Sequence, residues 1–245
     1  MGYFANRFVV GLLGLALPIV ITLVYAIFPT EGAGPQPLTS ISIYAWTDAG
    51  VVFDAFMTLI GGFLLTNCVV CFADRCWFEA VYGGLSGASA LLVVAFPTGV
   101  EGARAAIFCP GMTPCGHTGL HAAAAGAFIL TMIGYALYFF VREPRLRYWQ
   151  AVAKFPVKRF YIAMGSVIIV MLLWMALVAL PFLNNLLPTG VAGFLPDSVF
   201  WPEAFAVLAF GAAWMVKGYV MRETRHRAMH SIKTLIACLG STNRG

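Results

Sequence analysis

The sequence predicts an all-α polytopic membrane protein: a six-transmembrane-helix bundle with both termini cytoplasmic and an amphipathic, interfacial C-terminal helix. Composition is the first observation that favours this fold class. Of the 245 residues, 61% are hydrophobic and only 10% are charged, and the mean hydropathy is +0.86. So few polar side chains cannot cover a soluble globule of this size, and a bilayer therefore has to be the solvent.

Six apolar runs are the second observation. Each has about the 20 residues that cross a hydrocarbon core roughly 30 Å thick. The first run is too long for the apolar core of a secretory signal and lacks a small-residue cleavage pattern, so we expect a retained helix. We therefore predict a transmembrane domain over residues 1-221 and a basic cytoplasmic tail with the interfacial helix over 222-245. The runs cover residues 7-29, 49-73, 77-98, 118-141, 160-186 and 200-221.

The distribution of basic residues is the third observation. The connections 30-48, 99-117 and 187-199 contain only Arg104, whereas the other fourteen of the fifteen Lys and Arg residues flank the runs on the opposite side. Because basic residues are retained in the cytoplasm, this division predicts both termini inside and these three connections outside. The expected location is a bacterial cytoplasmic (inner) membrane. The basic residues behind the net charge of +5 are therefore interpreted as signals that orient the spans, and we expect no nucleic-acid partner.

The same cations predict contact with anionic lipid of the inner leaflet. Beyond the last span, apolar residues recur at helical spacing and basic residues occupy the opposite face, as in a helix lying on a membrane. Each basic residue near the surface contributes about 1 kcal/mol to such binding. Lys217 is expected to reach the headgroups too, and Glu79 to pair with Arg75 within its own helix end. The predicted headgroup-binding residues are Arg142, Arg145, Arg147, Lys154, Lys158, Arg159, Arg222, Arg225, Arg227 and Lys233.

Small residues in the third and fourth spans favour close helix packing. Gly83 and Gly87 stand four residues apart in the third span, and 122-126 is a run of alanines ending in glycine in the fourth. Such residues let helix backbones approach where lipid gives no hydrophobic drive for association. We expect these two spans to form the packed centre; the alternative is that the glycines merely reflect membrane composition.

Four ionisable residues are expected near the outer membrane surface: Asp54, His117, His121 and Glu203. The two histidines share one helix face, and Asp54 and His121 could face each other between the second and fourth spans. Together the four side chains could bind Zn or Cu, or act as an acid and base on a lipid headgroup. The alternative is structural, because Glu203 suits a helix N-terminus and the others could hydrogen-bond across helices.

The cysteines fall into two groups. Cys109 and Cys115 flank a Pro- and Gly-containing turn in an outer loop, which predicts a disulfide in an oxidising compartment. A redox-active or metal-binding pair is the alternative. Cys68 and Cys71 have the redox spacing but lack its strand-to-helix context, so we interpret them, with Cys76, as buried thiols.

Cofactor and function are less constrained by the sequence. His226 and His230 lie in the basic tail and the other two histidines share one helix, so a bis-histidine haem is not expected; bound lipid is expected, and a metal remains an alternative. Phosphate-binding glycine loops, nucleophile elbows and zinc-protease motifs are absent from the sequence. We therefore expect a non-enzymatic accessory or structural subunit of a membrane complex, which packs against lipid, pigment or partner helices. The alternatives are a lipid-modifying or metal-dependent enzyme with the outer Asp/His/Glu site and, more weakly, a transporter.

Four stretches carry a family resemblance: Ser40-Ile41-Ser42-Ile43-Tyr44 with Phe53 and Gly61-Gly62-Phe63-Leu64-Leu65; Ala95-Phe96-Pro97-Thr98; His121 with Phe128, Phe139 and Phe140; and Trp201-Pro202-Glu203 through Phe210 and Trp214 to Lys217-Gly218. In these stretches the chain resembles a bacterial DUF998-like group of integral membrane proteins, related to the Frag1/DRAM/Sfk1 families. The resemblance implies a six-helix bundle with no settled activity, and the eukaryotic relatives are linked to lipid handling and membrane organisation. The loop holding Cys109 and Cys115 and the tail beyond Gly218 depart from the pattern.

Overall fold

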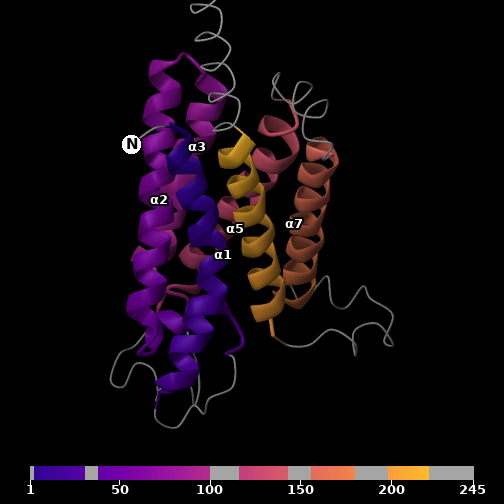
Figure 1. The fold of residues 1–245 in the computed structure, drawn as a ribbon. Coiled ribbons are helices and arrows are strands. Elements are labelled where there is room, and N and C mark those ends of the chain that lie inside the picture. The colour runs from indigo at the N-terminus through magenta and orange to yellow at the C-terminus, as the bar shows by residue number, and fades with distance from the viewer. Residues whose placement is uncertain (1–2, 31–37, 100–115, 143–155, 180–197, 221–245) are drawn as a thin grey trace, which may run out of the picture.

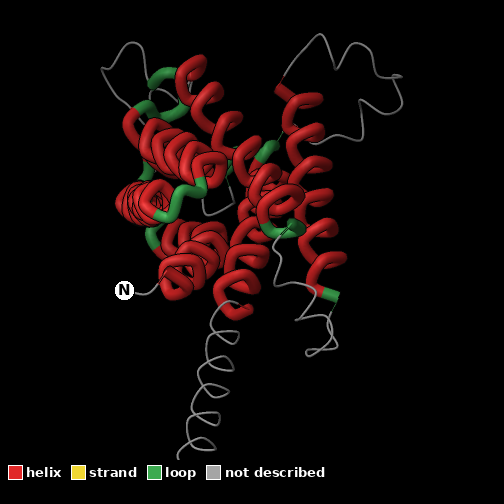
Figure 2. Tube along the Cα trace, turned by 90° about the horizontal axis from the view of Figure 1, so that it is seen from above, coloured by secondary structure: helices red, strands yellow, loops and turns green. Residues whose placement is uncertain are grey.

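The computed structural model describes residues 3–30, 38–99, 116–142, 156–179 and 198–220, and this part of the chain contains helices and no strand. Six of the helices are long and apolar enough to cross a membrane. They stand side by side in Figure 1, and Figure 2 shows the same bundle from above. The predicted all-α six-helix bundle is confirmed. The helices are α1 (Tyr3–Ile27), α2 (Gly50–Ala73), α3 (Trp77–Ala95), α5 (Thr118–Gly134), α7 (Val157–Ala179) and a sixth span, Phe200–Val220.

Within the described residues the helix ends agree with the predicted runs to within a few residues, and the differences have local causes; the predicted end of the fifth run at 186 lies outside the described part. Helix α3 ends at Ala95 because Phe96 precedes Pro97, and a residue before proline is pushed out of helical backbone angles. Helix α5 continues into a π-helix, Tyr135–Phe139, in which the Phe140 amide donates to the Tyr135 carbonyl over 2.9 Å. A short 3-10 helix, η1 (Ile41–Trp46), precedes α2 and was not predicted.

The glycines of α3 pack against α2. A Cβ atom added at Gly87 would lie 2.7 Å from the Gly61 carbonyl oxygen, and one at Gly83 would lie 3.1 Å from the Cys68 amide nitrogen. Gly119 and Gly126 of α5, in contrast, have nothing within 4 Å of such an atom. The third span is thus tightly packed as predicted, but the close approach is to the second span rather than the fourth.

A second close approach joins α1 to the sixth span. A Cβ atom added at Gly11 would lie 2.4 Å from the Met215 amide nitrogen, and one at Gly211 would lie 2.6 Å from that of Leu15. The sixth span is also the most buried of the six, with 56% of its apolar window inside the protein against 17% for Val157–Val178 of α7. The sixth span is therefore a central helix, and it carries both Glu203 and Lys217.

The three thiols near the junction of α2 and α3 differ in burial. Cys71 is buried and Cys68 is half-buried, whereas Cys76 is exposed. The prediction of a buried thiol is therefore wrong for Cys76, because α2 ends at Ala73 and this residue lies in the turn before α3.

Several predictions concern residues outside the described part of the chain. These include the cytoplasmic tail 222-245 with its interfacial helix, the Cys109 and Cys115 pair, and seven of the ten predicted headgroup-binding residues. The other three, Arg142, Lys158 and Arg159, have exposed side chains, as headgroup contact requires. The Arg142 guanidinium lies 4.2 Å from the centre of the Tyr138 ring.

Candidate functional site

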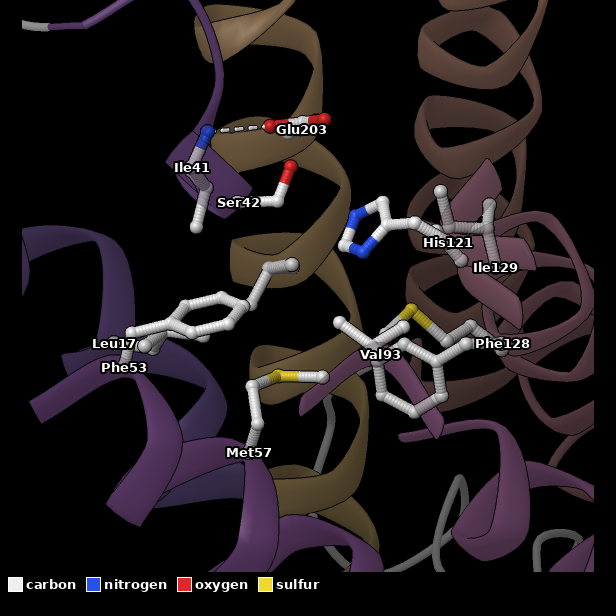
Figure 3. A pocket seen from close by; sticks show the side chains of 13 residues that line it. Leu17, Ile41, Ser42, Phe53, Met57, Val93, His121, Phe128, Ile129 and Glu203 are labelled. Atoms are coloured by element: carbon white, nitrogen blue, oxygen red, sulfur yellow. Dashed lines mark hydrogen bonds between the residues drawn. The ribbon is translucent and has the colours of Figure 1, made fainter. Parts of the chain in front are cut away.

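A cavity of ≈ 70 Å³ lies in the half of the bundle that the charge distribution predicts to be outer. Five spans and η1 contribute to its wall, and α7 does not. Figure 3 shows polar groups at one end of the cavity, near Glu203, and apolar side chains at the other. The lining residues are Leu17, Ile41, Ser42, Phe53, Met57, Val93, His121, Ala125, Phe128, Ile129, Met132, Glu203 and Val207.

Glu203 receives hydrogen bonds from the start of η1. Ser40 caps this helix, since its Oγ accepts from the Ser42 amide over 3.2 Å. The Ser40 hydroxyl contacts both carboxylate oxygens of Glu203, at 3.0 and 2.8 Å, and the Ile41 amide donates to Oε2 over 2.6 Å. The cap of one short helix therefore also fixes the carboxylate of a residue 163 positions away in the chain.

Aromatic packing fixes the rest of η1 above the cavity. Tyr44 is fully buried, and its ring meets that of Tyr25 edge-on with 5.2 Å between the centres. The Leu38 amide donates to the Tyr44 hydroxyl over 3.2 Å. Burial raises the pKa of the Tyr44 hydroxyl, so this group stays protonated at neutral pH. The Thr39 carbonyl also accepts from the Val199 and Phe200 amides, over 2.8 and 2.9 Å.

His121 approaches the cavity from α5. Its Nδ1 lies 2.8 Å from the Phe96 carbonyl oxygen, one of the last carbonyls of α3, which have no partner within their own helix. Because a carbonyl can only accept, Nδ1 carries a proton, so Nε2 has a lone pair when the ring is neutral. The end of α3 thereby sets the tautomer of His121.

The far end of the cavity is apolar. Phe53 and Met57 of α2 are buried one helical turn apart, and Phe128 of α5 lies opposite them in Figure 3. Met132 of α5 also lines the cavity. The Phe128 ring also packs on that of Phe210, with 6.0 Å between centres. The cavity therefore joins an apolar chamber to a small polar end.

The structure brings only two of the four predicted site residues together. His121 and Glu203 both line the cavity, whereas Asp54 and His117 do not. Asp54 is half-buried, and no hydrogen bond or ion pair joins it to the described residues. His117 is exposed at the start of α5, where its ring packs on Phe96. Within the described residues, no three His, Cys, Asp or Glu side chains are grouped to hold a metal ion.

A buried charged network occupies the opposite end of the bundle, which the charge distribution predicts to be inner. Arg7 of α1 forms an ion pair with Glu79 of α3, and only 2% of the Arg7 side chain is exposed. Arg75, which was expected to pair with Glu79, is instead an exposed turn residue with a φ of 60°. Lys217 is 1% exposed rather than extended to the headgroups, and its ammonium lies 5.4 Å from the Phe140 ring centre. Both corrections arise from contacts between residues distant in the sequence: Arg7 takes the place of Arg75 beside Glu79, and Phe140 lies against Lys217.

Two uncharged polar side chains are also buried at this end of the bundle. The Asn6 amide donates to the Phe63 carbonyl over 3.1 Å. Asn67 is 0% exposed, and its amide makes no hydrogen bond of normal length among the described residues, although the Tyr135 hydroxyl lies next to it. Buried polar groups of this kind are costly without partners. The sequence does display Asn67 as a polar residue within an apolar run, and it was overlooked.

The sequence reasoning also missed Ser40 and Ser42 as site residues. Both lie in the segment 40–44, which the resemblance singled out, and a serine preceding a short apolar stretch is a common helix cap.

Comparison with protein-family models finds no match, and neither curated proteins nor solved structures match the chain. The resemblance to the DUF998-like group stays a prediction.

Proposed function

We propose that this chain is a non-enzymatic membrane protein that binds an amphiphilic molecule in its outer cavity. The observation that carries the proposal is the division of the cavity wall: Phe53, Met57 and Phe128 line one end, and Glu203 and His121 the other. Ligand pockets in proteins are mostly apolar, with a few convergent polar groups that fix orientation. An amphiphile from the surrounding bilayer likewise has an apolar chain at one end and a polar head at the other.

The biological setting forms part of the same proposal. The proposed membrane is the bacterial inner membrane, and the positive-inside distribution supports a cavity in its outer half. A bound amphiphile suits an accessory or structural subunit of a larger membrane complex, which holds or presents a lipid without modifying it. Other membrane subunits and anionic lipids of the inner leaflet are the proposed partners.

A cavity-filling substitution tests the proposal. Ala125 lines the cavity, so the variant A125F should place a phenyl ring where the ligand binds. Ala123 lies on the same helix with an exposed side chain, so A123F is the matched control. The purified protein in lipid nanodiscs would be irradiated with an alkyl diazirine amphiphile, and labelled peptides would be identified by mass spectrometry. We expect labelling around 121–132 in wild type and A123F and its loss in A125F; equal labelling of all three would refute the proposal.

A lipid-modifying enzyme is the second candidate, and one observation favours it. The hydrogen bond from His121 Nδ1 to the Phe96 carbonyl leaves Nε2 able to accept a proton, as a general base does. Incubation of the protein with membrane lipids and analysis of the products by mass spectrometry tests this candidate. Turnover by wild type and its loss in H121Q, with photolabelling retained, would favour the enzyme over the binding protein.

A further inference from the structure

We infer that the outer cavity selects an amphiphile with one alkyl chain and a positively charged, hydrogen-bond-donating head, such as a long-chain primary amine. The inference rests on the proposed binding function and deepens it. The polar groups that line the cavity, Glu203, Ser42 and His121, all direct lone pairs rather than protons toward a ligand. The hydrogen bonds that each group already makes within the protein are the reason.

The first two acceptors belong to one chain of hydrogen bonds. A bound cationic head favours the ionised form of the Glu203 carboxyl. In that form Glu203 has no proton to give, so Ser40 donates its single hydroxyl proton to it. The Ser40 and Ser42 hydroxyl oxygens are 2.7 Å apart, and with the Ser40 proton already used, Ser42 is the donor in this contact. The Ser42 oxygen then offers only lone pairs to the cavity. Glu203 keeps lone pairs as well, since a carboxylate can accept about four hydrogen bonds.

The third acceptor is His121. The Phe96 carbonyl holds the proton of the ring on Nδ1 over 2.8 Å, and Nε2 is consequently an acceptor. The wall that His121 shares with Glu203 and Ser42 therefore offers three kinds of acceptor. A ligand head that itself only accepts, such as a carboxylate or phosphate, finds no donor among these three groups.

The charge of Glu203 favours a cation over a neutral alcohol. Its hydrogen-bond donors, Ser40 and Ile41, are uncharged, and within the described residues the recorded ion pair is that of Arg7 with Glu79 at the other end of the bundle. A carboxylate without a cationic neighbour in a poorly polarisable site binds an ammonium group more strongly than a hydroxyl. An anionic head would instead be repelled by it.

The size of the cavity favours a single chain. One water-sized group needs roughly 10–15 Å³ of such space, so a cavity of ≈ 70 Å³ admits a head and the first few carbons of one chain. The branched glycerol of a two-chain phospholipid is larger than this. Phe53, Met57 and Phe128 would contact the first carbons of the chain, and the remainder would extend beyond the cavity.

The test compares heads on one chain length. Dodecylamine, dodecanol and dodecanoate, at equal mole fractions in phosphatidylcholine nanodiscs, would compete with a diazirine dodecylamine for labelling of wild type, E203Q, A125F and D54N. The side-chain amide oxygen that E203Q introduces can still accept from Ser40 and Ile41, so this variant removes the charge and retains acceptor capacity. Asp54 is a half-buried acid that does not line the cavity, so D54N is the matched control for charge.

We expect the amine to compete at least about tenfold better than the alcohol, because a charge-assisted hydrogen bond is stronger than a neutral one, and dodecanoate to compete least. E203Q should lose the preference for the amine and D54N should keep it. Equal competition by the three heads, or preference for dodecanoate, would overturn the inference about the head group. If labelling is nevertheless lost in A125F, the proposed binding function still stands. Undiminished labelling of A125F would refute both. Should E203Q fail to fold, the order of competition in wild type decides.

Discussion

Replacing Gly211 by alanine should weaken the contact between α1 and the sixth span. The added Cβ atom would lie 2.6 Å from the Leu15 amide nitrogen and 2.8 Å from the Gly11 carbonyl oxygen. Both neighbours are backbone atoms, so no side chain can rotate away. Ordinary contact begins at 3.4 Å, so the two helices have to part by about 0.8 Å, which forfeits a quarter to a half of the dispersion energy across the gap.

We expect a net loss of about 2 kcal/mol for G211A. Overpacking typically costs about 1 to 3 kcal/mol, and a clash between backbones belongs at the upper end of this range. The better helix propensity of alanine returns about 1 kcal/mol. Gly62 of α2 is exposed and has nothing within 4 Å of an added Cβ, so G62A should receive that gain without the clash.

Unfolding of both variants in mixed micelles, titrated with sodium dodecyl sulfate and followed by tryptophan fluorescence, measures the difference. The free energies of unfolding of G62A and G211A should differ by about 3 kcal/mol. If G211A unfolds at the same midpoint as G62A, the backbone contact of Gly211 with α1 is not a determinant of stability.

Three further predictions address other parts of the molecule. Glu79→Leu alone should destabilise the protein by about 3 kcal/mol or more, because it leaves the buried Arg7 charge without this carboxylate. Adding Arg7→Met should restore part of the lost stability. A double-mutant cycle measures the coupling between the two residues, and purely additive effects would contradict the prediction. Phosphatase and fluorescent-protein fusions after Gly34 and after Arg145 should report opposite sides of the membrane, and equal sidedness would overturn the topology. The two cysteines of loop 109–115 should resist thiol labelling in unreduced, denatured protein, and their alkylation there would disprove the disulfide.

The number and limits of the spans could be predicted from sequence because they depend on local properties. Span length follows from bilayer thickness, and the end of α3 at Ala95 follows from the proline at position 97. The 3-10 helix η1 was missed because Ile41–Trp46 is only six residues long. At that length an apolar segment has no period that separates it from a loop.

Two of the four predicted site residues line the cavity, and the reason for selecting them can be applied to each residue without knowledge of its neighbours. His121 and Glu203 are ionisable groups within apolar spans, and such groups are expensive unless they have partners. The same reasoning selected Asp54, which does not line the cavity. Depth in the membrane can be estimated by counting residues, but the direction in which a helix face points depends on its neighbours. Phe53 and Met57 of α2 point into the cavity, and Asp54, only one position beyond Phe53, does not.

The partners that organise this bundle are distant in sequence, which is why hydropathy could not identify them. Glu203 and Ser40 are 163 residues apart, and Arg7 and Glu79 are 72 apart. In a soluble protein the apolar face of each helix would select the core, but lipid is as apolar as leucine and gives helices no such preference. The pairing of helices then depends on close backbone approach, as at Gly211, and on polar side chains that interact inside the bundle. The two partners in such a contact have no characteristic separation along the chain, so the sequence does not show which helix meets which. Arg7 was accordingly interpreted as a topology signal alone, although its side chain is buried against the carboxylate of Glu79 in the third span.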